Sequence, residues 1–317
     1  MKRLFIYAVT AIALLSCTDE PECEPGNDEI RISALLAEVK PQTRTSIDGT
    51  GKASWANGDS LGLFCPQAKL AATNVKFSVA GLPGAPAWTP ATTIYWADAS
   101  TSHTFLAYAP YASGNASAAA VKLPALTPQT GTINPAQDFL ISNNYGTTGL
   151  ARPSDATVGL IFTHAFSLIQ LQITINSSIA SGTTLKSCTL AGVSSDKMYT
   201  SNAASTIALS SGTITTTTGT TVNTLTATPA SAPVLSGTLI NFFIIILPGT
   251  YTPSLQFTLT EGVTDIPVPA TNVTPIAYAA GSKYVYQVSI SRTAILLSNP
   301  TITDWTSVPS GNINGGI

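Results

Sequence analysis

The sequence predicts an all-β protein, and three observations support this fold class. Threonine makes up about one residue in seven, and β-branched residues favour strands over helices. From residue 29 onward, short apolar or alternating runs are separated by turn-forming Gly, Pro, Asn and Asp. No stretch carries the convincing apolar period of an amphipathic helix. Two antiparallel β-sandwiches are the simplest arrangement for so many short strands in 317 residues.

The composition is typical of an extracellular β-protein with a hydroxyl-rich surface. The chain is 44% hydrophobic and only 9% charged, whereas charged residues usually make up about a quarter of a soluble protein. The formal net charge is −2, and no basic stripe interleaved with aromatic residues is present. These features argue against a nucleic-acid partner.

The N-terminus predicts a lipoprotein signal peptide over residues 1–16. Lys2 and Arg3 precede an apolar run that is shorter than the about 20 residues of a membrane-spanning helix. The run ends in Leu-Leu-Ser before Cys17, which resembles a bacterial lipobox. The resemblance implies cleavage before Cys17 and a lipid on its thiol, which would anchor the protein in the outer membrane. The acidic residues 17–28, which contain two prolines, form a solvated tether.

We expect an N-terminal β-sandwich over residues 29–152. Its first strand is residues 29–39, with Ile30, Ile32, Leu35 and Leu36 as its apolar residues. A hairpin follows around an Asp-Gly turn, because the two-residue turn separates two short strand-like runs. The expected strands after the first are residues 43–47, 52–55, 60–65, 74–79, 93–96, 103–109 and 119–123. Turn signals accumulate over residues 143–157, so we place the domain boundary there.

The C-terminal β-sandwich is expected over residues 153–317. It opens with residues 158–175, whose apolar residues are too dense for a one-sided strand and predict a central one. Residues 239–247 form a continuous apolar run that predicts a buried central strand. The Thr/Gly-rich residues 210–224 predict an exposed hairpin or a mobile loop. The remaining expected strands are residues 184–193, 254–260, 281–290 and 299–305.

The sequence offers no set of residues that would support catalysis or metal binding. His103 and His164 lie in apolar surroundings without other ligand residues nearby, which predicts packed structural histidines. Three cysteines remain besides Cys17, and this odd number cannot pair completely within the chain. Two of them lie in expected strands and are interpreted as buried thiols; the three are Cys23, Cys65 and Cys188. We therefore expect no enzyme activity, no cofactor and no metal.

An ordered set of motifs extends through both halves of the chain. The motifs are TRTSIDG and ASWANGDSLGLF after residue 42, FTHAFSLIQLQI from 162, AGSKYVYQVSI from 280 and ITDW from 302. Together they resemble the fimbrillin-like (Mfa-like) surface lipoproteins of Bacteroidales. The resemblance covers nearly the whole chain and implies two tandem transthyretin-like β-sandwiches. It also implies surface export as a lipoprotein and, for many members, assembly with other fimbrillin subunits by strand exchange.

Arg44 and Thr45 match the Thr-Arg-Thr segment of that family. In shaft-type members an arginine-specific protease cuts after an arginine in the loop that follows the first strand. The resemblance therefore marks the bond between Arg44 and Thr45 as a processing site, with an ordinary solvent-facing arginine as the alternative. Arg31 is a rival site, but it lies inside the expected first strand and would be less accessible.

Two functions fit this sequence. The first is a fimbrial subunit assembled by protease-triggered β-strand exchange. The second is a non-polymerising surface lipoprotein of the same fold: a pilus anchor, a tip adhesin, or a binder of a glycan or host protein. A shaft subunit needs a free segment to donate, and residues 293–305 are a better candidate than the Gly-rich residues 307–317.

Overall fold

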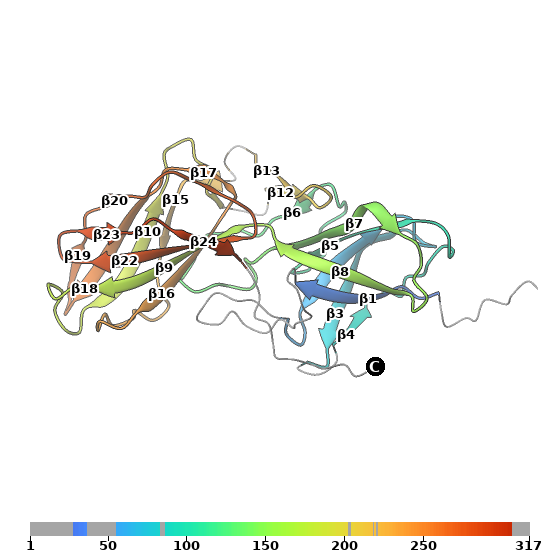
Figure 1. Cartoon of the computed structure of the whole chain (residues 1–317), viewed down its shortest axis with the longest axis horizontal. Coiled ribbons are helices and arrows are strands. Elements are labelled where there is room, and N and C mark those ends of the chain that lie inside the picture. The colour runs from blue at the N-terminus through green and yellow to red at the C-terminus, as the bar shows by residue number, and fades with distance from the viewer. Residues whose placement is uncertain are drawn as a thin grey trace, which may run out of the picture.

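The computed structural model describes residues 28–36, 55–82, 86–201, 204–217, 219 and 221–305. Every regular element in these ranges is a β-strand, which confirms the predicted all-β class. The described ranges contain no helix that is long and apolar enough to cross a membrane. Figure 1 shows an elongated molecule with two lobes, one built mainly from each half of the chain.

The N-terminal lobe is built on one seven-stranded sheet in the order β1-β8-β7-β5-β2-β3-β4. The strands of this sheet are β1 (Arg31–Leu36), β2 (Ser60–Cys65), β3 (Ala72–Ala80), β4 (Ala87–Pro90), β5 (His103–Ala109), β7 (Leu140–Leu150) and β8 (Thr157–His164). The sheet curls, so that β1 and β4 contact each other although they lie at its opposite ends. A hydrophobic cluster that includes Trp55, Phe105 and Phe162 fills this lobe.

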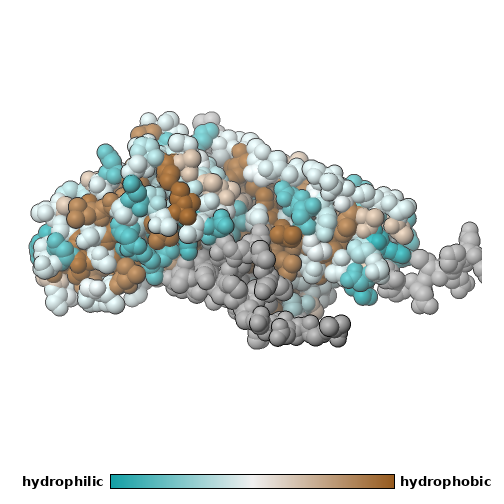
Figure 2. Space-filling view, in the orientation of Figure 1, coloured by the Kyte–Doolittle hydropathy of each residue, from teal (hydrophilic) through white to brown (hydrophobic). Residues whose placement is uncertain are grey.

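The C-terminal lobe contains two five-stranded sheets that share one hydrophobic cluster, so they pack face to face. The first sheet contains β9 (Ser167–Ile175), β16 (Ile240–Ile246), β22 (Ser282–Ile290), β23 (Ile295–Leu297) and β24 (Thr301–Asp304). The second contains β10 (Thr184–Ala191), β15 (Thr224–Ala227), β18 (Ser254–Glu261), β19 (Thr264–Pro267) and β20 (Thr271–Asn272). In Figure 2, hydrophobic side chains form small separate groups among polar ones on the visible face.

Short strands complete the two lobes. They are β6 (Val121–Lys122), β11 (Tyr199–Thr200), β12 (Thr206–Ala208), β13 (Thr213–Thr215), β14 (Thr221–Val222), β17 (Gly249–Tyr251) and β21 (Ile276–Tyr278). β12 and β13 form a hairpin that pairs with β6, but only β13 lies within residues 210–224, and β14 from the same stretch pairs with β11. The expected strand at residues 93–96 forms only an isolated bridge, between Tyr95 and Glu29. Residues 43–47 and 52–54 lie outside the described residues.

The division between sheets falls later in the chain than expected. Residues 158–175 form two strands, β8 and β9, which belong to different lobes and are separated by Ala165 and Phe166. The turn-rich residues 143–157 lie within and after β7, inside one sheet, so the sheets do not divide between residues 152 and 153. Two pairings, β1 with β8 and β9 with β22, are parallel, although the sequence predicted antiparallel sheets.

β16 is buried as predicted, but it lies at the edge of its sheet and not at the centre. Residues 121–131, which we call the strap, cover that edge. The N–H of Phe243 donates to the Gly131 carbonyl at 2.8 Å, and apolar side chains of the strap join the cluster of the C-terminal lobe. Gly131 has φ +80°, and a Cβ there would overlap the ring of Phe242. The strap thus takes part in the C-terminal lobe, although β7 and β8 follow it in the chain.

Candidate functional site

β1 is an edge strand with one buried face. It hydrogen-bonds over its whole length to a single described strand, β8. Every second residue is buried, and more exposed residues lie between them. The buried residues are Ile30, which precedes the strand, and Ile32, Ala34 and Leu36 within it. Leu35, one of the expected apolar residues of this strand, is half-buried on the other face. Removal of β1 would therefore uncover an apolar groove along β8. Burial of each large aliphatic side chain contributes about 1.5–3 kcal/mol, so this exposure would be unfavourable.

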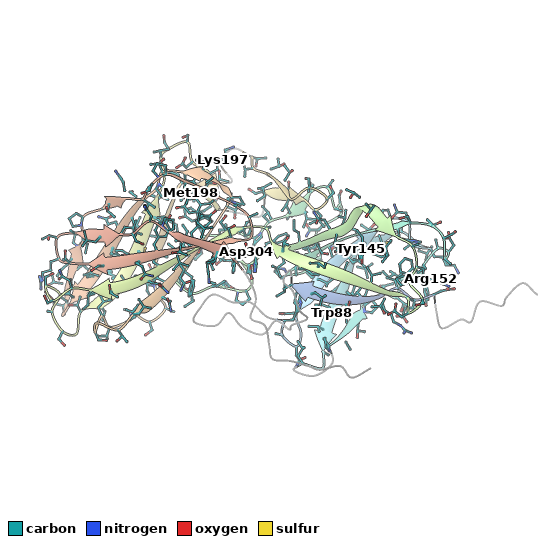
Figure 3. All side chains as sticks on the ribbon, viewed as in Figure 1. Trp88, Tyr145, Arg152, Lys197, Met198 and Asp304 are labelled. Atoms are coloured by element: carbon teal, nitrogen blue, oxygen red, sulfur yellow. The ribbon has the colours of Figure 1, made fainter. Side chains whose placement is uncertain are left out.

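Contacts with three other segments hold the start of β1. Arg152 forms an ion pair with Asp28, and the Asp28 carbonyl accepts a hydrogen bond from the N–H of Trp96 at 2.8 Å. The N–H of Ile30 donates to the Ile94 carbonyl at 2.9 Å. The N–H of Arg31 donates to the carbonyl of Ala156 at 3.1 Å. We call these four contacts the Asp28 clamp; Figure 3 shows Arg152 at the outer end of the N-terminal lobe.

Ala156 is itself in an uncommon conformation. Its φ of 56° lies in the left-handed region, which costs a non-glycine residue about 1–2 kcal/mol. The indole N–H of Trp96 also donates to the Ala156 carbonyl, at 3.4 Å. In this conformation the Ala156 carbonyl accepts hydrogen bonds from both Arg31 of β1 and the Trp96 indole. The contact thus ties β1 to the rest of the lobe.

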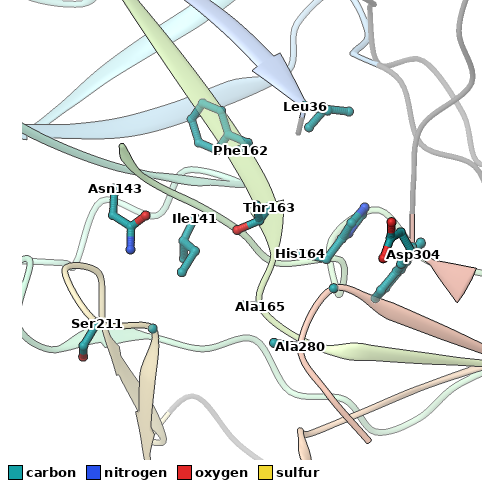
Figure 4. Close-up of a pocket in the computed structure, with 13 residues that line it drawn as sticks. Leu36, Ile141, Asn143, Phe162, Thr163, His164, Ala165, Ser211, Ala280 and Asp304 are labelled. Atoms are coloured by element: carbon teal, nitrogen blue, oxygen red, sulfur yellow. The ribbon is translucent and has the colours of Figure 1, made fainter. Parts of the chain in front are cut away.

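A crevice of about 520 Å³ opens at the other end of β1, between residues of the two lobes (Figure 4). Both lobes contribute to it, because β1 and β8 end there and β24 reaches it from the C-terminal lobe. Its buried apolar lining consists of Leu36, Ile141, Phe162, Ala165 and Trp305. Its exposed polar residues are Asn143, Thr163, Ser211 and Asp304. The crevice is therefore continuous with the groove that β1 occupies.

His164, the last residue of β8, joins this crevice to the end of β24. Its Nδ1 lies 2.6 Å from Oδ1 of Asp138, and its ring stacks on Trp305 with 4.0 Å between centroids. The N–H of Trp305 donates to the Gly281 carbonyl at 2.6 Å. These contacts confirm His164 as a packed structural histidine.

His103 is also a packed structural histidine. It is fully buried in an edge contact with Trp96, and its Nδ1 lies 2.7 Å from the Thr101 carbonyl oxygen. No three His, Cys, Asp or Glu side chains within the described ranges gather closely enough to hold a metal ion.

The site residues named from the sequence fall outside the described residues. Cys17, Arg44 and Thr45 are all in this position, as is Cys23. The rival Arg31 has an exposed side chain, but its backbone is hydrogen-bonded within the sheet.

Cys65 and Cys188 are confirmed as buried thiols that form no disulfide. Burial raises the pKa of Cys65 to about 11 and raises the pKa of Cys188 further. Both thiols are therefore neutral at physiological pH and unsuited to act as nucleophiles or metal ligands.

Sequence reasoning missed Arg152, which holds the start of β1, and Trp305, which lines the crevice. Arg152 pairs with a residue 124 positions away, and Trp305 packs on a histidine from the other lobe. No spacing or local pattern marks such pairs, because they depend on how the chain closes in three dimensions.

A family model described as fimbrillin-like matches residues 43–305. The chain belongs to the fimbrillin-like family. This membership confirms the resemblance that the ordered motifs indicated. The matched region begins after β1 and ends at Trp305, so the edge strand lies outside it.

Similar proteins cover most or almost all of the chain. Fim1C of Bacteroides uniformis, named as a candidate fimbrium subunit, is 28% identical over 331 residues, which cover 99% of this chain and 98% of that protein. The solved structure of a candidate cell adhesion protein from the same species has 22% identity and a TM-score of 0.57, covering 89% of this chain and 100% of its own. One from Bacteroides ovatus has 17% identity and a TM-score of 0.57, covering 89% and 99%. These two structures share the fold of this chain.

Proposed function

We propose that this chain is a fimbrial subunit, exported as a lipoprotein on Cys17 to the cell surface and assembled by exchange of β1. The observation that carries the proposal is β1 itself, an edge strand with a buried apolar face. The segment that contains Arg44 connects it to Trp55, the next described residue. Support also comes from the relative named as a fimbrium subunit and from a family match that begins after β1.

Cleavage between Arg44 and Thr45 would separate β1 from the rest of the chain without cutting a described strand. β1 would then be held only by its hydrogen bonds, its clamp and its buried side chains. Its departure would leave the backbone edge of β8 unpaired beside an apolar groove, which is an unstable surface. A strand from another subunit would satisfy both by β-augmentation.

The test uses the purified chain from residue 18 and an arginine-specific protease. We expect a fragment that begins at Thr45, release of the 18–44 peptide and oligomers that grow with protein concentration. Arg44→Lys should block all three while it keeps the positive charge. Resistance of Arg44 in the folded protein, or cleavage that yields only unfolding monomers, would contradict this function.

One observation favours the second candidate, a non-polymerising surface lipoprotein. The expected donor segment, residues 293–305, is not free: β23 and β24 both pair with β22, and Trp305 is buried. An anchor, a tip adhesin, or a binder of a glycan or host protein needs no donated strand. This candidate predicts that the cleaved chain stays monomeric and that its C-terminal strands stay protected from hydrogen exchange.

A further inference from the structure

We infer that Asn144 keeps β8 in strand conformation when β1 is absent, so that the edge of β8 can receive a strand. The inference rests on the proposed function and adds a positioning residue to it. It concerns the accepting subunit alone and holds whichever strand fills the groove. Asn144 acts on the side of β8 that faces β7.

β8 has little backbone support from β7. Although both strands are described in full, they pair over only two residues of each, Leu140 with His164 and Ile141 with Thr163. β1, by contrast, pairs with β8 over its whole length. Loss of β1 would therefore leave residues 157–162 of β8 outside any ladder with a described strand.

The side chain of Asn144, from β7, takes the place of the missing ladder. Its Nδ2 donates to the Gly159 carbonyl at 2.9 Å, and its Oδ1 accepts from the Ile161 N–H at 3.1 Å. An amide carries both the donor and the acceptor that a neighbouring backbone would present. The ladder with β1 uses the alternate residues, beginning at the Ala156 carbonyl, so the contacts of Asn144 remain when β1 leaves.

A bulge in β7 directs Asn144 toward β8. In the ladder between β5 and β7, Ala107 pairs with Ser142 and Phe105 with Tyr145, so three steps along β7 match two along β5. The buried Ser142 also donates from its Oγ to the Oδ1 of Asn144 at 2.9 Å, which fixes the orientation of the amide. The side chain is therefore held in place by β7 itself.

Gly159 makes this support important. A glycine inside a strand weakens it, because glycine loses more conformational freedom on folding than other residues. Among the described residues, a Cβ at this position would meet the Ser33 Oγ alone, at 3.8 Å, which is an ordinary contact. Alanine can therefore replace this glycine without a clash and would stiffen β8.

The contact of Asn144 with β8 matters most while the groove is empty. With β1 in place, its ladder also holds β8, so loss of Asn144 changes the filled state little. In the empty state the same loss lowers the fraction of subunits in which β8 is ordered, and the apparent affinity for a strand falls with that fraction. The association rate falls for the same reason, whereas the dissociation rate stays nearly constant.

The experiment measures capture and release of β1 and does not depend on cleavage at Arg44. A viral-protease site replaces residues 46–51 in the chain from residue 18, and the severed β1 peptide carries a fluorophore at its N-terminus. Serial dilution, followed by anisotropy, gives the dissociation constant. A chase with an excess of the same unlabelled peptide gives the dissociation rate. One urea concentration, common to all variants, brings release into a measurable range.

Asn144→Ala should raise the dissociation constant at least 10-fold and change the dissociation rate less than 3-fold. Asn143→Ala is the matched control, because this neighbouring side chain bonds to the Ser210 carbonyl instead, and it should change neither value more than 2-fold.

Gly159→Ala should have the opposite effect. In the natural background it should lower the dissociation constant about 2- to 5-fold, and it should restore part of the affinity lost in Asn144→Ala. This second variant keeps the test decisive if Asn144→Ala does not fold.

The inference is overturned if Asn144→Ala weakens capture no more than Asn143→Ala, or if its effect lies in faster dissociation with an unchanged association rate. It is also overturned if Gly159→Ala does not strengthen capture, or if β1 leaves only when the whole lobe unfolds. If the variants behave as expected but the naturally cleaved chain forms no oligomers, the proposed fimbrial assembly fails and the role of Asn144 stands. If oligomers form equally fast with Asn144→Ala, only the role of Asn144 fails.

Discussion

At the scale of single residues, one side chain takes the place of a neighbouring strand. Gln129 is buried in the strap; its Nε2 donates to the Ile245 carbonyl at 2.8 Å, and its Oε1 accepts from the Ile245 N–H at 2.8 Å. The same Nε2 also donates to the Leu126 carbonyl at 2.8 Å. A glutamine amide carries the donor and the acceptor that a backbone would present, so it closes the edge of β16.

Gln129→Leu should therefore destabilise the protein by about 2–4 kcal/mol. The substitution leaves the N–H and C=O of Ile245 buried without partners, and each such group costs about 1–3 kcal/mol. Urea unfolding at equilibrium would measure the loss. Gln287→Leu, at an exposed position of β22, is the matched control and should change stability by less than about 0.5 kcal/mol. Equal stability of the two variants would mean that the strap does not close this edge.

Cys65 gives a prediction about pH. Burial raises the pKa of Cys65 to about 11, whereas an unfolded cysteine has a pKa of about 8.5. The unfolded chain therefore loses this proton first, and the stability linked to Cys65 falls as the pH rises from about 8.5 toward 11.

In a Cys23→Ala background without Cys17, a thiol-reactive chromophore at pH 8 should label the two buried cysteines only after denaturation. Rapid labelling of the native protein would contradict the buried assignment.

At the scale of elements, the sequence predicted strands where a local run begins and ends at turn residues. β2 and β5 match residues 60–65 and 103–109, and β22 lies within 281–290. The break between β8 and β9 was missed, because Ala165 and Phe166 continue the apolar run and no Gly or Pro marks the crossing. The position of β16 at an edge was missed because the residue that covers it, Gln129, is 116 positions away. Such pairings are set by tertiary packing, which local patterns do not encode.

β16 is covered on both faces, so charge should be tolerated on neither. Phe243 and Ile245 are buried, and Ile244, which points to the opposite face, is fully buried. Phe243→Asp, Ile244→Asp and Ile245→Asp should each cost more than about 4 kcal/mol and largely abolish folding, because each places an unpaired carboxylate in the core. Leu239→Asp, just before the strand and 48% exposed, is the control. Thermal melting would decide, and a wild-type melting temperature for any of the three would show that one face is open.

At the scale of the whole molecule, the chain passes between the lobes more than once. The strap joins the C-terminal cluster, β7 and β8 return to the N-terminal sheet, and Ala165 leads into β9. The stack of His164 on Trp305 then ties the last described strand back to the junction. A boundary placed by turn signals at residues 143–157 was reasonable from the sequence, but those turns belong to one sheet. The family resemblance, by contrast, could be predicted from the sequence, because the order of motifs along the chain can be recognised without knowing which residues contact each other.

The expected lipid anchor concerns the whole molecule, because it would set where every other part operates. We expect mass spectrometry of the membrane-extracted protein to show a chain that begins at Cys17 and carries acyl groups. Cys17→Ala should abolish acylation and release the protein from the membrane fraction, while Cys23→Ala changes neither. A free Cys17 thiol in the natural protein, or cleavage at another position, would contradict the lipoprotein assignment.

The strap also makes this protein a poor subject for dissection into recombinant halves. A fragment that begins at residue 153 would lack Gln129 and Gly131, and β16 would present an uncovered row of backbone donors and acceptors to any passing chain. Its first strand would be β8, which in the whole chain lies between β1 and β7. The fragment lacks both of these neighbouring strands. The complementary fragment, ending at residue 152, would keep β1 without its partner. Each half would expose unpaired strand edges, so we expect neither fragment to fold as it does in the whole chain.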